Sequence, residues 1–445
     1  MTAHPNFRVD IYQNEFLPEG AREVNAIVTV ASDSSSPAVS QTGPSVAAAE
    51  VIIVDCSGSM DYPRGKMIAA RQATAAAIDA LRDGVAFAVI AGTDQARLVY
   101  PLQPGLVAAD ARTRAAAKAA VNMLKAGGGT AIGRWLALAN TLFAGTGSAF
   151  SQPSRPPAIR HAILLTDGRN EHERPEALAH TLSVCEGKFV CDCRGVGTDW
   201  EVDELRRVAT ALLGTVDIVA DPTGLEADFR AMMAAAMSKA VADVVLRLWT
   251  PQGASIKFVK QVAPEVADLT ARRVTTGAQV GDYPTGAWGT ESRDYHVCVE
   301  VKPAGVGDVM LAGRVSLLLT GTGGQDEVLG QGLVKATWTD DMVLSTRINP
   351  EVAHYTGQAE LADVIQEGLE ARKTGDLDTA TAKLGRAVAL ATKSGNADTA
   401  ALLAKVVDID DPVTGTVRLK AKVSDEDTMT LDTRSTKTSR VRKSS

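Results

Sequence analysis

The chain has 445 residues, and at roughly 150 residues per domain this length predicts about three domains rather than one. Hydrophobic residues make up 45% and charged residues 22% of the sequence, a composition that excludes a largely disordered chain. The formal net charge of −7 argues against a surface built to bind nucleic acid or an anionic membrane, because both reward basic residues.

The sequence also bears on where the protein works. Its first residues, MTAHPNFRVDIYQNEF, lack the basic and then apolar pattern of an export signal, and no run reaches the roughly 18 apolar residues of a membrane helix. The five cysteines are irregularly spaced, which does not indicate a disulfide framework. We therefore expect a cytoplasmic protein with no membrane insertion and no nucleic-acid partner.

The N-terminal segment has the pattern of a β-hairpin. Residues 6–32 alternate apolar and polar side chains around the turn LPEGAR, and residues 32–48 are rich in Ser, Pro and Gly, which predicts a mobile connection. Because a lone hairpin is unstable, we expect the segment 1–45 to pair with a later β region.

The next segment, residues 46–240, alternates short apolar runs with Ala-rich helical stretches. Fully apolar strands between amphipathic helices are typical of a parallel sheet that is covered on both faces. The prediction is an α/β domain with a doubly wound, mostly parallel sheet, inserted between the two pieces of the β region.

Three further segments follow. Residues 241–345 return to strand patterns with Gly-rich turns, which predicts an antiparallel β-sandwich. Residues 346–412 contain two helices joined by Thr-Gly-Asp, which resemble one tetratricopeptide-type helical hairpin, too short an array for a continuous core of its own. Residues 413–445 are rich in Thr and poor in large apolar residues, so we expect a disordered tail.

The strongest chemical signal follows the apolar strand VIIV. Asp55, Ser57 and Ser59 come directly after it and offer a carboxylate and two hydroxyl oxygens on a tight loop. In an open α/β sheet, ligands bind outside the carboxyl ends of the strands near a topological switch point. This combination of oxygen atoms suits a hard divalent cation.

Two other motifs belong on the same edge of the sheet. Thr130 follows a run of three glycines, and Asp167 follows the apolar strand RHAILLT. Together, Asp-x-Ser-x-Ser at 55–59, Gly-Gly-Thr at 128–130 and Thr-Asp-Gly at 166–168 resemble the motifs of the von Willebrand factor A domain, and the resemblance covers 46–240.

The resemblance implies a metal-ion-dependent adhesion site, or MIDAS. Ser57, Ser59 and Thr130 would be oxygen ligands, and Asp55 and Asp167 would hold the ion directly or through water. The implied ion is Mg²⁺, with Mn²⁺ or Ca²⁺ as alternatives, and the implied partner is a protein that supplies an Asp or Glu as the last ligand. A capping turn before the following helix is the structural alternative for the first three residues.

Enzymatic interpretations find little support. The sequence has no phosphate-binding Gly-x-x-x-x-Gly-Lys-Ser/Thr, no His-Glu-x-x-His and no Gly-x-Ser-x-Gly. His161, His172 and His180 lie near Asp167 in the sequence, where one could act on a metal-bound water, but such histidines are more often structural. Cys191 and Cys193 would point to one face of a strand and are interpreted as core residues. We therefore predict no catalytic residues.

The threonines of the tail are candidate phosphorylation sites, namely Thr428, Thr430 and Thr433. A flexible threonine-rich segment is accessible to a kinase, and Thr428 with Leu431 three residues later resembles the motifs that forkhead-associated (FHA) domains read. An inert solvated tail is the alternative.

Two functional hypotheses follow. The first is a non-enzymatic interaction module that captures an acidic group of a partner at the metal site, within Ser/Thr kinase and FHA signalling, since bacterial A-domain proteins of this layout resemble components of such systems. The alternative is the A-domain subunit of an ATPase-driven metal-insertion or remodelling complex, whose motor is another polypeptide.

Overall fold

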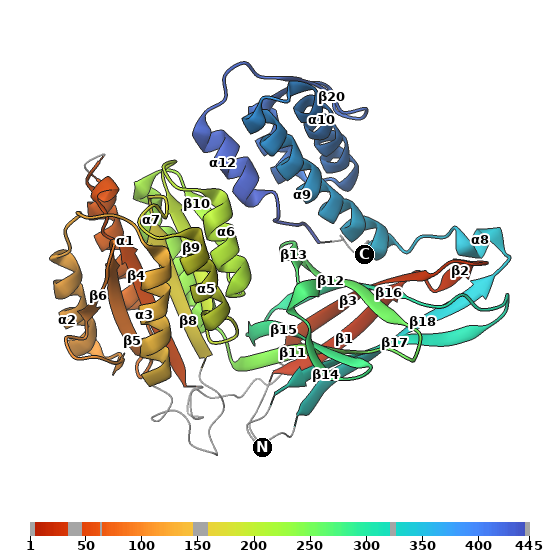
Figure 1. The fold of residues 1–445 in the computed structure, drawn as a ribbon, viewed down its shortest axis with the longest axis horizontal. Coiled ribbons are helices and arrows are strands. Elements are labelled where there is room, and N and C mark those ends of the chain that lie inside the picture. Colours follow the sequence, from red (N-terminus) through yellow and green to blue (C-terminus); the bar gives the residue numbers. More distant parts are fainter. Residues whose placement is uncertain (1–4, 34–46, 63–64, 146–158, 321–325, 441–445) are drawn as a thin grey trace. The chain divides into compact units, whose positions relative to one another are not determined.

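The structure is a computed structural model that describes residues 5–33, 47–62, 65–145, 159–320 and 326–440. The chain forms two compact units, of which one comprises Met1–Pro37 with Asp243–Ser445 and the other comprises Ala38–Ala242 (Figure 1). The predicted mobile connection at 32–48 lies almost wholly outside the described residues.

The second unit is an α/β fold built on one mixed sheet. The strand order is β10-β9-β8-β4-β5-β6, with the short β7 also paired to β5. The first five of these strands run parallel, whereas β6 and β7 are antiparallel to β5. The strands are β4 (Ala48–Asp55), β5 (Ala86–Gly92), β6 (Ala96–Tyr100), β7 (Val107–Ala108), β8 (Ile159–Thr166), β9 (Val190–Val196) and β10 (Val216–Val219).

Helices cover this sheet. Helix α1 packs on α2 and α7, whereas α3 packs on α5 and α5 packs on α6. Every residue of the central strand β4 is buried, as a strand covered on both faces requires. The helices are α1 (Lys66–Ala80), α2 (Ala111–Asn122), α3 (Ile132–Gly145), α5 (Pro175–Cys185), α6 (Val202–Ala211) and α7 (Leu225–Met237), with 3₁₀ turns at η1 (Gly58–Asp61) and η2 (Pro222–Gly224). The doubly wound fold predicted from the alternating pattern is confirmed.

The first unit contains two β-sheets. Their orders are β1-β3-β16-β12-β13 and β14-β15-β11-β17-β18-β2. Most neighbours are antiparallel, whereas β2 runs parallel to β18. Strands β1 and β18 pack together so closely that a Cβ on Gly332 would lie 2.4 Å from the Ile11 side chain. The N-terminal strand β3 lies between β1 and β16, so the beginning of the chain is part of the later β region.

The bounds of these strands are β1 (Asn6–Gln13), β2 (Phe16–Pro18), β3 (Glu23–Asp33), β11 (Val241–Trp249), β12 (Ser255–Ala263), β13 (Ala267–Asp268), β14 (Val274–Gly277), β15 (Val280–Trp288), β16 (Ser292–Glu300), β17 (Val309–Leu319) and β18 (Glu327–Thr339), with a 3₁₀ turn at η3 (Thr270–Arg272). They form the predicted antiparallel β-sandwich.

A helical segment follows the sandwich. The helices α9 and α10 form the predicted hairpin, and the turn between them contains Gly375 with a φ of 86°, a conformation that glycine adopts without strain. The elements are α8 (Met342–Ser345), α9 (Pro350–Thr374), α10 (Leu377–Ser394), α11 (Ala397–Val406), β19 (Val407–Asp411), β20 (Thr416–Leu419) and α12 (Asp425–Arg434). Among the described residues, no helix combines the length and the apolar character needed to cross a membrane.

The expectation of a disordered tail from residue 413 is wrong for the part that the structure describes. Strand β20 pairs with β19, and α12 packs on α11 and α9. Leu431 is fully buried in one apolar cluster with Val417, Leu384 and Leu403. The few apolar residues of this segment fall where they face the preceding helices, so a low apolar content is enough to fold it.

The last described residues return to the sandwich. The backbone N–H of Val266 donates to the carbonyl of Thr436 at 2.8 Å, and the backbone N–H of Thr438 donates to Pro264 at 3.0 Å. The Thr438 hydroxyl also donates to the Val262 carbonyl at 2.7 Å. We call residues 436–440 the C-terminal strap.

Candidate metal centre

The predicted site residues meet at one edge of the α/β sheet. Asp55 is the last residue of β4 and Asp167 follows the end of β8. These two strands are parallel neighbours, with Val54 opposite Leu165, so their carboxyl ends lie together. Since β5 lies on one side of β4 and β8 on the other, this edge is also where the strand order reverses, the usual position of a ligand in such a sheet.

Asp55 is buried and held on both carboxylate oxygens. Its Oδ1 accepts the backbone N–H of Ser57 at 2.7 Å, and its Oδ2 accepts the hydroxyl of Thr166 at 2.5 Å. Burial raises the pKa of Asp55 to about 6, although the hydrogen bonds from Thr166 and Ser57 act in the opposite direction. A buried carboxylate in this state favours a cation nearby.

Three hydroxyl oxygens surround a small space beside Gly168. A Cβ atom on Gly168 would lie 3.2 Å from Thr130 Oγ1, 3.3 Å from Ser59 Oγ and 3.8 Å from Ser57 Oγ. The two serine oxygens are 2.9 Å apart, and Ser59 donates to Asp167 Oδ1 at 2.7 Å. The structure therefore brings all five predicted residues together.

This arrangement fits a hard divalent cation. The donors are hydroxyl and carboxylate oxygens, which Mg²⁺ prefers over nitrogen or sulfur. Ser57 and Thr130 are buried, whereas Ser59 is exposed, so the space is open on one side. Within the described part of the chain, no group of three His, Cys, Asp or Glu side chains could hold a metal, so the hydroxyls are essential to this fit.

The loop after β8 fixes the Thr130 loop through three side chains. His172 Nδ1 accepts the Thr130 N–H at 3.1 Å, Asn170 Oδ1 accepts the Ile132 N–H at 2.7 Å, and Glu173 Oε1 accepts the N–H of Gly133 at 2.5 Å. These side chains satisfy backbone groups at the start of α3.

The sequence analysis missed Asn170 and Glu173 and considered His172 only in other roles. One signal could have pointed to them. Ala131 directly precedes α3 and offers no side-chain acceptor, so the first N–H groups of that helix need acceptors from elsewhere in the fold.

Lys66 is another residue of the site that the sequence analysis missed. Its Nζ lies 2.8 Å from Asp167 Oδ2 and 3.1 Å from Asp199 Oδ2. Burial acts to lower the pKa of Lys66, but the hydrogen bonds and charges of Asp167 and Asp199 outweigh it and raise the pKa. A permanent positive charge therefore contacts one of the two predicted metal-holding carboxylates.

His161 lies near the other end of β8, in the core. Its Nδ1 is 2.9 Å from Glu50 Oε2 and its Nε2 is 3.1 Å from Asp192 Oδ2. Asp167 lies six residue steps further along the chain, which is about 20 Å at the usual rise per residue of a strand. It cannot reach a water at the metal site, in agreement with a structural role.

The remaining candidate residues of the α/β unit are the two cysteines of β9 and one histidine, which differ in exposure. Cys191 and Cys193 are fully buried, as expected of core residues. His180 is an exposed residue of α5.

The candidate phosphorylation sites lie in helix α12. Thr433 is buried, with 1% of its surface exposed, and its hydroxyl donates to the carbonyl of Met429. Thr428 and Thr430 are partly exposed, and the Thr428 hydroxyl donates to the Ser424 carbonyl at 3.2 Å. A kinase could not reach Thr433 in this fold, so the flexibility on which that prediction depended is absent from this helix.

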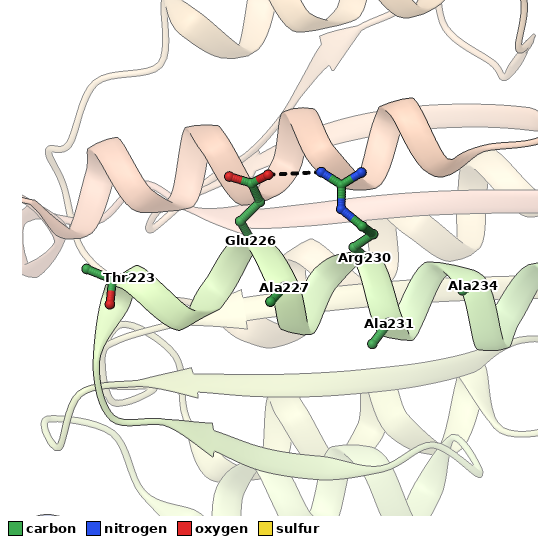
Figure 2. A pocket seen from close by; sticks show the side chains of 6 residues that line it. All are labelled: Thr223, Glu226, Ala227, Arg230, Ala231 and Ala234. Atoms are coloured by element: carbon green, nitrogen blue, oxygen red, sulfur yellow. Dashed lines mark hydrogen bonds and ion pairs between the residues drawn. The ribbon is translucent and has the colours of Figure 1, made fainter.

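A shallow hollow lies on α7 of the same unit, and Figure 2 shows its lining. Three alanines form much of it, and Glu226 and Arg230 form an ion pair of 2.9 Å along the helix. Its residues are Thr223, Glu226, Ala227, Arg230, Ala231 and Ala234. Since the two charges neutralise each other, this surface offers no comparable set of ligands.

The fold and the site define an α/β domain with a cluster of hydroxyl and carboxylate oxygens at its switch point, joined to a β-sandwich and a helical segment. The family model described as von Willebrand factor type A domain matches residues 49–218, and the one described as von Willebrand factor type A C-terminal domain matches residues 389–435. A solved structure of von Willebrand factor type A from Catenulispora acidiphila is 55% identical, with 98% of each chain covered and a TM-score of 0.91. The chain belongs to the von Willebrand factor type A family.

More distant structures share the fold. The ArnB paralog VWA2 from Sulfolobus acidocaldarius matches over 96% of this chain and 97% of its own, at 14% identity and a TM-score of 0.56. Proximal thread matrix protein 1 from the mussel byssus was solved with a zinc-occupied MIDAS motif. The match covers 43% of this chain and 46% of that protein, at 21% identity and a TM-score of 0.34, which is too low to transfer its metal. No protein with a curated description matches the chain. Domains of this family commonly mediate metal-dependent protein interactions, and most are not enzymes.

Proposed function

We propose that the chain is a non-enzymatic, cytoplasmic interaction module that uses a divalent ion, Mg²⁺ in the first instance, to capture an acidic side chain of a protein partner. The observation that carries the proposal is the convergence of Ser57, Ser59 and Thr130 on one small space beside Gly168. These hydroxyls come from two loops that are far apart in the sequence. A capping turn alone does not explain why Thr130 joins them.

The hydrogen-bond pattern orients the serine oxygens. An ionised Asp167 can only accept, so the 2.7 Å bond fixes Ser59 as its donor. The proton of the bond between the two serines must then come from Ser57. Both hydroxyls thus have their protons engaged, and their remaining lone pairs are available to a cation.

Charge balance favours an acidic partner. Asp55 and Asp167 together carry two negative charges, one of which is already paired with Lys66, and the three hydroxyls are neutral, so a divalent ion would leave an excess of positive charge. Such an ion would bind and polarise a carboxylate oxygen of the partner at an open coordination position. Ser59, the exposed member of the set, lies on the side from which a partner could approach.

The test is an affinity purification from native lysate with the wild type and Asp55→Ala, each with Mg²⁺ or with a chelator. The matched control is Glu171→Ala, which removes an exposed carboxylate from the loop after β8. We expect partners that are retained by the wild type and by the control, and lost on mutation of Asp55 or on chelation. Partners that persist in every lane would contradict the proposal. Recovery of an ATPase would favour the alternative function, a subunit of a metal-insertion or remodelling complex.

A regulatory part of this proposal concerns Thr428. It follows three acidic residues in α12, and its hydroxyl donates to the Ser424 carbonyl, so a phosphate would be repelled by the neighbouring carboxylates and would loosen this end of the helix. Phosphorylation by a Ser/Thr kinase would provide a ligand for an FHA-domain partner. Intact mass measurement of the protein from native cells tests this part, and an unmodified chain under all growth conditions would remove it.

A further inference from the structure

The lysine at the metal centre occupies an unfavourable position in its helix. Lys66 is the first residue of α1, and the first turn of this helix, KMIA, contains no acidic residue. The positive end of the helix dipole disfavours a cation there. Its side chain is also 96% buried, and burial of an ammonium group carries a large desolvation cost.

Two carboxylates compensate for the desolvation cost of the Lys66 ammonium group. Asp167 and Asp199 each bind the ammonium group, and the two carboxylates differ in exposure, because the Asp167 side chain is fully buried whereas that of Asp199 is 70% exposed. The lysine chain passes Gly197, where a Cβ would lie 3.6 Å from Lys66 Cε. The ammonium group is thus shared between a carboxylate of the metal site and a carboxylate at the surface.

Asp167 divides its two oxygens between Lys66 and the hydroxyl cluster. Oδ2 contacts the ammonium group, and Oδ1 accepts the proton of Ser59. Among the described residues, no cationic side chain contacts Asp55, the other carboxylate of the site. A divalent ion would therefore add two positive charges beside an existing one. Three positive charges would then face Asp55 and Asp167 in the buried part of the site, while the third carboxylate, Asp199, is 70% exposed and screened by water.

We propose that Lys66 is a resident cation that competes with the divalent ion for Asp167, and that Asp199 retains Lys66 when the ion binds. The inference rests on the proposed function, since it needs a metal ion at Ser57, Ser59 and Thr130. Its consequence is a site of low intrinsic metal affinity. The carboxylate of a partner then supplies the missing negative charge, so metal and partner each strengthen the binding of the other.

The experiment measures Mn²⁺ binding to the full chain by electron paramagnetic resonance, without a partner. Lys66→Met removes the charge and keeps much of the apolar stem, and we expect it to bind Mn²⁺ about tenfold more tightly than the wild type, a conservative value for removing a like charge beside a divalent ion. Lys66→Arg keeps the charge and should bind no more tightly than the wild type.

A second variant tests the role of Asp199 without disturbing the core. Asp199→Asn leaves Lys66 with Asp167 alone, and we expect Mn²⁺ affinity to fall about threefold to tenfold. Glu171→Gln removes an exposed carboxylate from the same edge without touching Lys66, and it should stay within about twofold of the wild type. Equal effects of these two variants would show general electrostatics instead of a specific exchange.

Thermal unfolding gives an independent readout. The rise in Tm caused by saturating Mn²⁺ should be larger for Lys66→Met than for the wild type, because the variant without metal leaves its carboxylates uncompensated. Unchanged or weaker Mn²⁺ binding by a folded Lys66→Met, or an unchanged Asp199→Asn, would overturn the inference alone. Absence of Mn²⁺ binding in the wild type and in every variant would overturn the proposed function as well.

Discussion

Two buried clusters of carboxylates lie on the same strands of the α/β sheet and differ in how their charge is balanced. One is the candidate metal centre with Asp55 and Asp167, at the carboxyl ends of β4 and β8. The other is the group of Glu50, His161 and Asp192, on the same two strands and β9. Buried charge alone would make each cluster a candidate functional site.

In the second cluster, the charged side chains are paired with one another inside the protein. His161 lies between two carboxylates, and Asp192 Oδ1 also accepts the backbone N–H and the hydroxyl of Thr215 at 2.7 and 2.8 Å. The pKa of His161 rises to about 10, because the two carboxylates outweigh the effect of burial. Asp192 is half-buried, with 19% of its side chain exposed, and bonding to His161 holds the pKa of that carboxyl well below its usual range.

The candidate metal centre differs because three hydroxyl oxygens converge beside Gly168, within 3.2–3.8 Å of the position that a Cβ would take. The comparison teaches that a buried charged group with all its partners inside the protein stabilises the fold, whereas oxygens directed at a common gap indicate a ligand.

Loss of the central imidazole should have the largest effect on stability. His161→Ala leaves the buried Glu50 and the half-buried Asp192 without their cation, and we expect the free energy of unfolding to fall by about 3–5 kcal/mol. Urea denaturation measures this loss. Mn²⁺ affinity of the folded variant should be unchanged, and a stability loss below about 1 kcal/mol would show that the cluster is not an obligatory ion group.

The opposite outcome is expected at the metal centre. Asp55→Asn should weaken Mn²⁺ binding at least about 100-fold, or about 2.7 kcal/mol, while the free energy of unfolding without metal changes by less than about 1 kcal/mol, since a buried charge is removed. Metal titration and urea denaturation on the same samples separate the two effects. A large stability loss with normal metal binding would reverse the assignment of the two clusters.

The pH dependence of stability sharpens the comparison further. The folded-state pKa of His161 is about 10, above the unfolded value of 6.5, so its contribution is complete below pH 6.5 and is lost as pH rises toward 10. The stability difference between the wild type and His161→Gln should therefore shrink by about 2–3 kcal/mol between pH 7 and pH 9. Urea denaturation at several pH values checks this, and a constant difference would contradict it.

The smallest effect concerns the loop that supports Thr130. His172→Ala removes the acceptor of the Thr130 N–H, and we expect about 1 kcal/mol weaker Mn²⁺ binding, which is roughly fivefold. His180→Ala changes an exposed histidine on α5 and is the matched control. Equal Mn²⁺ affinity of the two variants would show that His172 does not position the loop.

The candidate metal centre was predictable because Asp55 and Asp167 directly follow apolar runs that indicate strands. The apolar runs that end at Asp55 and Asp167 indicate parallel strands, and parallel strands place their carboxyl ends on one edge. Lys66, Asn170 and Glu173 could not be found in this way. Their contacts depend on how loops fold against each other, and no periodic pattern in the sequence encodes that.

The tail shows a different limit of sequence analysis. Average composition predicts disorder when apolar residues are few, but Val417 and Leu431 lie where the helices α9, α10 and α11 need them. Such a segment folds when its few apolar residues stand at the positions that face apolar side chains of neighbouring elements. The average composition carries no information on those positions.

The pairing of β3 with β16 has a consequence for synthesis of the chain. Thr29 and Asp294 are hydrogen-bonded neighbours that lie 265 residues apart in the sequence. On the ribosome, β3 must therefore wait until the whole of the α/β unit has been made. The inserted unit has all its strands available earlier, so it can fold first. The unit that surrounds it in the sequence is completed only when the C-terminal strap emerges.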